Sequence, residues 1–526
     1  MTGPSPGRPQ GRAPGAAPER PLPPRFPLLL AALLLTSAMS MLDQSIVATA
    51  GPRLTAELGA LDLYSWTFTA YMLTFSVAMP IYGKLGDLFG RRTVYLSAVV
   101  IFLVGSAACG AADSMGELIA YRALQGLGGG GLQVSAFAVL GDLMPPRQRA
   151  RYQGFFAGVM VLANLAGPLV GGVLTDQLGW RWIFYVNIPL GLLALAGLRL
   201  LLPAGPRPAT RPRIDYPGTA LLTLLIAALV LATDFAGREG WTDARVLALG
   251  AAAVVLAVAW VLRERKAPEP IVPLALFGDR TFAICVTVAF AVSFAFFGCV
   301  NFVPLFLQTV TGASASQTGL LFLPAMIGMA VATVVAGQII GRTGRYKWFP
   351  VASTALAAVA ALLMSLDTAH ATPAKVATLL AVMGVGVGLS SQVTTLVAQS
   401  TSPRAHLGVS TSTVGLARNL GTAFGATVFG ALLNTRLATE ATRLLPADTA
   451  QSVTAGTWDP SRTNPQVAEA YGNALGTVFL SAVPVLLVAL IPALLMKDDR
   501  LEARGPGGPG GPGGRPGTPE AKTRAA

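Results

Sequence analysis

Long apolar runs alternate with short polar segments along most of the chain. Fourteen runs can be distinguished, and each is close to the roughly 20 residues with which an α-helix crosses about 30 Å of hydrocarbon. The apolar residues of a run form a block instead of repeating with a helical or strand period, which indicates membrane spans. The runs lie at 26–49, 64–82, 93–111, 117–140, 153–175, 182–202, 217–234, 245–262, 281–306, 317–340, 348–366, 375–398, 407–433 and 474–496. The pattern predicts an all-α integral membrane protein.

Composition supports this prediction and excludes several classes of function. Of 526 residues, 53% are apolar and 12% are charged, whereas an average soluble domain has about 25% charged residues. The net charge of +13 comes from short loops and tails, so the positive-inside rule explains it better than a nucleic-acid partner. The three cysteines lie within apolar runs, and no spacing typical of a metal site or a hydrolase triad is present. We therefore expect no enzyme, no metal and no cofactor.

The distribution of basic residues predicts the orientation in the membrane. An even number of spans puts both ends of the chain on one side, and lysine and arginine concentrate on that side. The termini are therefore expected in the cytoplasm of a bacterial cell. The tails 1–25 and 497–526 are rich in Pro, Gly and Arg and are predicted to be disordered. The segment 434–473 is expected to be a long outer loop.

A charged, glycine-rich hinge follows the second run, at 83–92. Its two outer glycines and first arginine recur with the same spacing at 337–345, where Gly341 replaces the acid Asp87. The first hinge follows run 2 and the second follows run 10, so they are eight runs apart. Duplication of a six-helix unit would place them six runs apart. Two helices are therefore predicted to have been inserted between two six-helix halves.

This reasoning gives a domain plan of six, two and six helices. The N-terminal bundle is expected at 26–202, and the two inserted helices with their linkers at 203–280. The C-terminal bundle is expected at 281–496, with the outer loop at 434–473. Parallel six-helix halves of this kind build the major facilitator fold.

Four motifs give the chain a more specific resemblance. It resembles the major facilitator superfamily, and within it the fourteen-helix drug:proton antiporters of the EmrB/QacA type. Residues 41–52 match the acidic motif of the first helix, 83–92 the gating loop, 121–131 the arginine motif of the fourth helix and 167–172 the antiporter motif of the fifth. The tenth and thirteenth runs contain no carboxylate, although some relatives that export dications use acids there.

Asp43 is the carboxylate that lies deepest inside a run. A charge at this depth is costly, so an intramembrane acid is a functional candidate. Asp43 lies about seven residues before the outer end of the first run, and Arg122 about six residues after the outer end of the fourth. At 1.5 Å per residue both lie roughly 10 Å below the outer surface, where they can meet. The resemblance implies that the pair couples transport to protons; the alternative is a static ion pair that joins two helices.

The resemblance also assigns roles to two glycine-containing motifs. The gating loop is expected to grip neighbouring helices in the outward-facing state through Gly83, Asp87, Gly90, Arg91 and Arg92. Its alternative role is a topology signal alone. The antiporter motif is expected to limit leakage through Gly167, Pro168, Gly171 and Gly172. Its alternative role is ordinary helix packing, because small residues let helices approach closely.

Five further polar side chains are placed at membrane depth. They are Gln125, Asn301, Gln392, Arg418 and Asn419. Each is a candidate for lining a central substrate cavity, and each has the alternative role of bonding a neighbouring helix.

These features predict an exporter. We expect a monomer in the bacterial cell membrane that moves amphipathic drugs or a natural product outward by alternating access. Protons are its coupling ion, with one carried by Asp43, and the lipid bilayer is its surroundings. The alternatives are a proton symporter that imports a small nutrient and a membrane scaffold or sensor that transports nothing.

Overall fold

The computed structural model describes residues 25–60, 63–203, 214–310, 312–313, 315–366, 372–454, 464–497 and 500–501. Within these ranges the regular structure is helical, apart from an isolated bridge between Arg345 and Arg500. The helices are α1 Phe26–Leu58, α2 Trp66–Phe89, α3 Arg91–Gly110, α4 Met115–Leu143, α5 Pro146–Gln177, α6 Trp182–Tyr185, α7 Asn187–Leu201, α8 Tyr216–Glu239, α9 Ala244–Glu264, α10 Arg280–Val300, α11 Val303–Val310, α12 Ala315–Thr343, α13 Trp348–Ser365, α14 Pro373–Thr401, α15 Leu407–Leu444, α16 Ala447–Thr454 and α17 Pro465–Leu494, with 3-10 turns η2 Leu274–Gly278 and η3 Arg404–His406. Almost all of the two expected tails lies outside the described residues.

The prediction of an all-α membrane protein is confirmed. In the described part of the chain, thirteen helices are long and apolar enough to cross a membrane. Two of these spans contain a break in the backbone, between α6 and α7 and between α10 and α11. The remaining expected run lies in α2, which has 24 residues but is not among the thirteen, since threonine, serine and tyrosine lower its hydropathy. The count of fourteen therefore stays a prediction.

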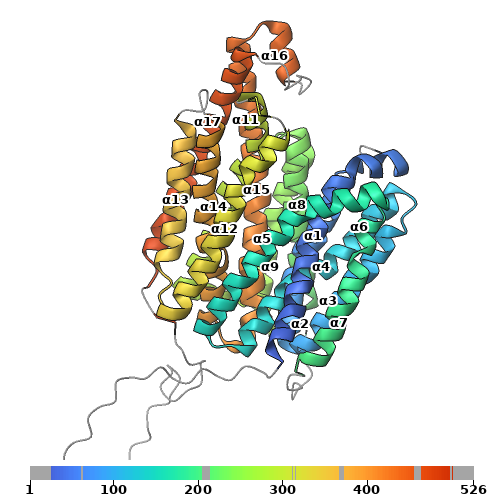
Figure 1. Ribbon diagram of the computed structural model, residues 1–526. Coiled ribbons are helices and arrows are strands. Elements are labelled where there is room, and N and C mark those ends of the chain that lie inside the picture. The colour runs from blue at the N-terminus through green and yellow to red at the C-terminus, as the bar shows by residue number, and fades with distance from the viewer. Residues whose placement is uncertain are drawn as a thin grey trace, which may run out of the picture.

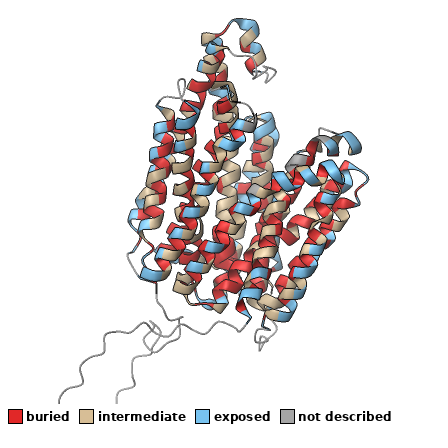
Figure 2. Cartoon of the chain, viewed as in Figure 1, coloured by how far each residue is buried: buried red, intermediate tan, exposed pale blue. Residues whose placement is uncertain are grey.

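The helices form two bundles with separate cores (Figure 1). Side chains from α1 to α7, among them Leu33, Tyr95 and Phe156, form the core of the N-terminal bundle. Side chains from α10 to α17, among them Phe282 and Phe479, form the core of the C-terminal bundle. Buried residues lie between the helices, and exposed residues lie on the outer faces (Figure 2). Because those outer faces carry many large apolar side chains, they suit contact with lipid and not with water.

The hairpin of α8 and α9 contacts both bundles. On one side, the hydroxyl of Thr69 in α2 donates to the Asp234 carboxylate in α8 at 2.8 Å. On the other, the hydroxyl of Thr427 in α15 donates to the carbonyl of Thr233 at 3.2 Å. The hairpin therefore bridges the two halves, in agreement with an insertion between them, whereas the arrangement of six, two and six helices stays a prediction.

The two bundles meet through glycines at the end where α1 begins and α17 ends, which we call the base (Figure 1). A Cβ atom on Gly83 would lie 2.7 Å from the carbonyl oxygen of Gly408, so α2 crosses α15 without room for a side chain. A Cβ atom on Gly337 would lie 2.5 Å from the carbonyl oxygen of Ala150 and 3.0 Å from the Cα of Gly154, where α12 crosses α5. Only glycine permits backbones to approach this closely.

The expected outer loop at 434–473 is wrong over much of its length. Helix α15 continues to Leu444, α16 occupies Ala447–Thr454, and α17 begins at Pro465. The extension of α15 is amphipathic: Leu437 and Ala441 are buried, whereas Arg436, Glu440 and Arg443 lie on its more exposed side. Hydropathy alone misses such a helix because one face is apolar and the other is charged.

The glycine crossing at the base gives a first prediction. Gly408→Val should hold α2 and α15 apart, because the new side chain would overlap the backbone of Gly83. Spin labels on cysteines introduced at the exposed positions Phe89 and Arg404 should then report a longer distance than in the parent protein. The three native cysteines are buried and should not react.

Gly319→Val provides the matched control, because a Cβ atom on Gly319 meets nothing within 4 Å. An unchanged distance distribution in Gly408→Val would show that the crossing does not set the separation of the bundles.

Candidate functional site

Asp43 and Arg122 form an ion pair inside the N-terminal bundle. The distance from Arg122 Nη1 to Asp43 Oδ2 is 2.5 Å, and the two side chains are 1% and 0% exposed. Asp43 lies on α1 and Arg122 on α4, so the structure brings together the two residues that helix geometry places at one depth. Removing one partner of such a pair typically costs about 3–5 kcal/mol, because a buried charge is left uncompensated.

Two amides complete the coordination of the carboxylate. Gln125 Nε2 donates to Asp43 Oδ1 at 2.7 Å, and Asn187 Nδ2 donates to the same oxygen at 3.0 Å. Both amides also donate to the hydroxyl of Ser106, at 3.0 and 2.9 Å. Ser106 in turn donates to the carbonyl of Phe184 at 2.9 Å. We refer to Asp43, Ser106, Arg122, Gln125 and Asn187 as the carboxylate network.

Arg122 is held by further contacts with α2. Its Nε donates to the carbonyl of Thr67 at 3.3 Å, and its guanidinium lies 4.2 Å from the centroid of the Tyr71 ring. Its Nη1 also donates to Gln125 Oε1 at 2.7 Å. The charge of Arg122 is therefore compensated by a carboxylate, two carbonyl oxygens and an aromatic face.

Glycines in the neighbouring helices make this network possible. A Cβ atom on Gly105 in α3 would lie 2.6 Å from the Cα of Gln125 in α4, so the two helices touch at the network. Gly128 and Gly129 allow Phe102 and Tyr71 to approach α4 in the same way. The run of glycines in α4 therefore serves the packing that carries Arg122 and Gln125 to Asp43.

The gating loop closes the base through Asp87. Its two carboxylate oxygens accept hydrogen bonds from the backbone N–H groups of Gly408 and Val409, each at 3.1 Å. These groups lie at the N-terminus of α15, where a negative charge is favoured by the helix dipole. Arg91 forms ion pairs with Asp87 and, at 2.9 Å, with Asp142. Burial raises the pKa of the Asp87 carboxyl group, and Arg91 and the two backbone donors oppose this.

The other residues of the gating loop lie elsewhere. Gly90 has φ +92°, a conformation that favours glycine, and separates α2 from α3. Arg92 donates to the carbonyl of Arg199 in α7 at 2.5 Å, so it joins two helices of the N-terminal bundle. Of the expected gating residues, Gly83, Asp87 and Arg91 lie at the contact between the bundles.

Gly167 is the residue of the antiporter motif that a neighbour constrains most. A Cβ atom there would lie 2.7 Å from the Cβ of Ser45 in α1, two residues after Asp43. Gly171 is buried, Pro168 is exposed, and Gly172 has no atom within 4 Å of a Cβ position. The motif therefore brings α5 against α1 beside the carboxylate network.

Comparison with known proteins agrees with these features. The model of the Major Facilitator Superfamily matches residues 33–426. The chain is 39% identical over 412 residues to the multidrug transporter protein MdtP of Bacillus subtilis, and the aligned region covers 78% of this chain and 75% of MdtP. It is 40% identical over 482 residues to the uncharacterized MFS-type transporter Rv1877 of Mycobacterium tuberculosis, with 90% and 70% covered.

The chain belongs to the major facilitator superfamily. The solved proton:xylose symporter XylE has a similar fold, with a TM-score of 0.56, 15% identity, and 88% of this chain and 95% of XylE covered. The protein is therefore a multi-pass membrane transporter and not an enzyme.

The structure places the five expected cavity residues of the transporter in three different surroundings. Gln125 belongs to the carboxylate network. Asn301 is exposed between α10 and α11. In the C-terminal bundle, Arg418 donates to Thr395 Oγ1 at 3.2 Å and to the carbonyl of Ser391, and Asn419 donates to the sulfur of Met79 at 3.4 Å. Gln392 is half-buried on α14.

Sequence reasoning missed Asn187 and Ser106. Asn187 lies in the segment that follows the antiporter motif, where its polarity within an apolar run was the available signal. Serine gives no such signal, because Ser106 differs little from the other small residues of α3. The described residues contain no group of three or more metal-ligating side chains.

The geometry of the network gives a second prediction. Asn187→Ala should lower the free energy of unfolding by about 1–3 kcal/mol, because the carboxylate loses a buried donor. Thermal unfolding of the purified protein would measure the change. Asn301→Ala is the matched control, since Asn301 is exposed and the loss should stay within about 0.5 kcal/mol. Equal stability of the two variants would contradict the structural role of Asn187.

Proposed function

We propose that this transporter exports amphipathic small molecules in exchange for protons, by alternating access, across a bacterial cytoplasmic membrane. The base faces the cytoplasm, both termini lie there, and the proton gradient is the energy source. The observation that carries this proposal is the buried carboxylate network, in which Asp43 receives three donors within a membrane-spanning bundle. A buried carboxylate of this kind in a membrane span is typical of proton relays.

Proton binding to Asp43 requires the network to rearrange. A neutral carboxyl group has a hydroxyl that donates, so one of its oxygens must release Arg122, Gln125 or Asn187 and find an acceptor. Release of Arg122 would separate α1 from α4 and free the guanidinium to interact more strongly with Thr67 and Tyr71. Proton exchange is thus coupled to a change in helix packing.

The gating loop provides the second element of the cycle. With Asp87 bound to the N-terminus of α15, the bundles are joined at the base. Arg149 adds to this closure, because its Nη1 donates to Gln399 Oε1 in α14 at 2.9 Å. Opening toward the cytoplasm requires these contacts to break, so the arrangement corresponds to a state closed on the cytoplasmic side.

Import of a nutrient with protons is the main alternative. The fold does not decide between the two directions, since a symporter shares it. Export is favoured by the relatives whose names describe multidrug or efflux transport. It is also favoured by the antiporter motif, whose Gly167 packs beside Asp43. A scaffold that transports nothing is disfavoured, because the chain belongs to a family of transporters.

The central test is Asp43→Asn. If Asp43 carries the proton, this variant should lose proton-driven efflux down to the background of empty vesicles, because an amide does not titrate. Dye accumulation in inverted membrane vesicles under an imposed pH gradient measures the transport. Asp176→Asn serves as control, since Asp176 is an exposed acid at the end of α5. Full efflux by a folded Asp43→Asn protein would refute the coupling role, and uptake in the opposite direction would favour the symporter.

A further prediction concerns the gating loop. Asp87→Ala should reduce transport about tenfold or more, because the loss of a single charge-assisted hydrogen bond typically changes an equilibrium by about that much. Substrate affinity should stay within about twofold. The loss acts on closure of the base and not on a substrate contact. Parallel measurements of efflux and of substrate binding would separate the two effects. Loss of binding as severe as the loss of transport would show that the loop is needed for folding.

A further inference from the structure

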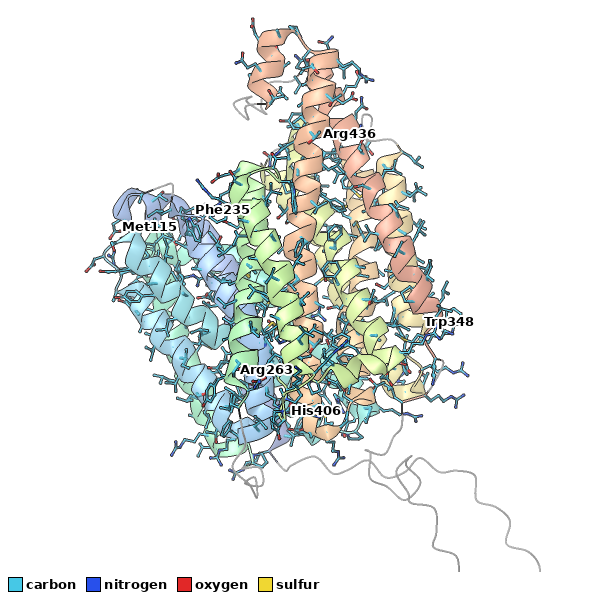
Figure 3. The ribbon with its side chains drawn as sticks, turned by 180° about the vertical axis from the view of Figure 1, so that it is seen from behind. Met115, Phe235, Arg263, Trp348, His406 and Arg436 are labelled. Atoms are coloured by element: carbon cyan, nitrogen blue, oxygen red, sulfur yellow. The ribbon has the colours of Figure 1, made fainter. Side chains whose placement is uncertain are left out.

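Two arginines near the interface between the bundles have no carboxylate partner in the described part of the chain. Arg418 lies on α15 between His406 at the base and Arg436 toward the opposite end, both labelled in Figure 3. It is eleven residues from Leu407, where α15 begins, which puts it roughly 16 Å from the base and near the middle of a 30 Å membrane. Within the described residues its guanidinium contacts only neutral oxygens, those of Ser391 and Thr395.

Arg149 is the second such cation and lies nearer the base. It is 4% exposed, and its Nη1 donates to Gln399 Oε1 at 2.9 Å. The same oxygen accepts from Gln153 Nε2 at 3.1 Å. Asp142 acts on Arg149 from a distance, but its ion pair is formed with Arg91.

Both cations contact one helix, α14. Arg418 reaches Ser391 and Thr395, and Arg149 reaches Gln399. These three positions are spaced by four residues, so they lie on one face of the helix and span roughly 12 Å along it. We call this face, with Gln392 and the two arginines, the α14 polar track. No carboxylate of the described residues lies within 4 Å of either guanidinium.

Buried atoms along the track also lack hydrogen-bond partners. Among the described residues these atoms include Arg149 Nε, Gln153 Oε1 and Gln392 Oε1. Buried polar atoms without a partner are rare in folded proteins, and they point to a ligand, an ion or water. Of these three atoms, Arg149 Nε is a donor and suits an anion, whereas the two amide oxygens are acceptors and suit water. The other buried cations differ, because Arg122 is paired with Asp43 and Arg91 with Asp87.

We infer that the transported molecule carries an anionic group, such as a carboxylate or a sulfonate, and that Arg418 binds this group. The inference rests on the proposed function and adds the charge class of its substrate. An uncompensated guanidinium at membrane depth attracts an anion strongly, because the surrounding dielectric constant is low. Arg149, nearer the cytoplasm, attracts the same group once the base opens.

The charge of such a substrate suits export. The inside of a bacterial cell is negative, so the membrane potential drives an anion outward and a proton inward. Exchange of one for the other therefore uses the electrical gradient twice, whereas a cationic substrate would have to leave against it.

Binding of two matched ions tests the inference. Tetraphenylborate and tetraphenylphosphonium have nearly the same size and shape and opposite charges. Equilibrium dialysis of the purified, full-length protein in detergent, corrected with protein-free micelles, would measure both affinities. In Arg418→Gln the affinity for tetraphenylborate should fall about tenfold or more, because the coulombic attraction between the guanidinium and the negative ion is lost in surroundings of low dielectric constant. The affinity for tetraphenylphosphonium should stay the same or rise.

Two further variants control for charge and position. Arg418→Lys keeps the charge and should retain the preference for the anion. Arg436→Gln removes an exposed arginine from the same helix and should change neither affinity. If Arg418→Gln does not fold, the wild-type protein alone still tests the inference, because tetraphenylborate should raise its unfolding temperature more than tetraphenylphosphonium does.

Other outcomes would overturn the inference. One is an equal loss of affinity for both ions in Arg418→Gln, and another is an unchanged affinity of this variant for tetraphenylborate. A third is an equal rise in the unfolding temperature of the wild type with either ion. Because these measurements need no proton gradient and no transport, they are independent of the test of Asp43. If proton-driven efflux is absent but the preference for the anion is found, the proposed function fails and the inference stands. If efflux is found but the preference is absent, the inference fails and the proposed function stands.

Discussion

The close approach of four glycines at the base determines how the two halves of the transporter fit together. Gly83 of α2 lies against Gly408 of α15, and Gly154 of α5 lies against Gly337 of α12. With no side chains at these crossings, backbone can touch backbone, and small residues are the usual means of such contact between membrane helices. The remaining contacts at the base depend on this proximity, because the carboxylate of Asp87 reaches the N-terminus of α15 only when the helices touch.

The two crossings are related by the internal duplication. Gly337 follows Gly83, and Gly408 follows Gly154, by the same interval of 254 positions (337 minus 83 and 408 minus 154). The geometry of closure is therefore shared by the halves, whereas the chemistry is not. One crossing carries the acid Asp87, and the other has a glycine at the equivalent position and basic residues at the start of α5. The duplicated scaffold thus leaves each half free to carry different charged groups. The first half holds the buried ion pair of Asp43 and Arg122, and the second holds Arg418, which has no carboxylate partner among the described residues.

Sequence reasoning succeeds here where one physical rule decides the outcome. The length of a membrane span places Asp43 and Arg122 at one depth, and the structure finds them in contact. It fails where tertiary contacts decide. The hinge residue Arg92 contacts α7 instead of the C-terminal bundle, and its sequence neighbourhood does not distinguish it from Arg91. The helical extension of α15 was missed because a criterion based on mean hydropathy rejects amphipathic segments. Ser106, which accepts from the two amides, and Asn187, which donates to Asp43, come from separate helices, so no local pattern predicts them.

In the proposed exchange of protons for substrate, the position of the carboxylate network constrains how the two are coupled. Asp43 lies within the N-terminal bundle, whereas the α14 polar track lies at the contact between bundles, so the two ligands do not compete for one site. Coupling must therefore pass through a helix that touches both regions. Helix α5 meets this requirement, because Gly167 packs against Ser45 beside Asp43, and Arg149 and Gln153 donate to Gln399 of the track. The same helix forms the crossing with α12 at Gly154. Thirteen residues separate these glycines, roughly 20 Å along a continuous helix. In the proposed cycle, a shift of α1 on proton binding would be transmitted along α5 to the crossing that holds the base closed.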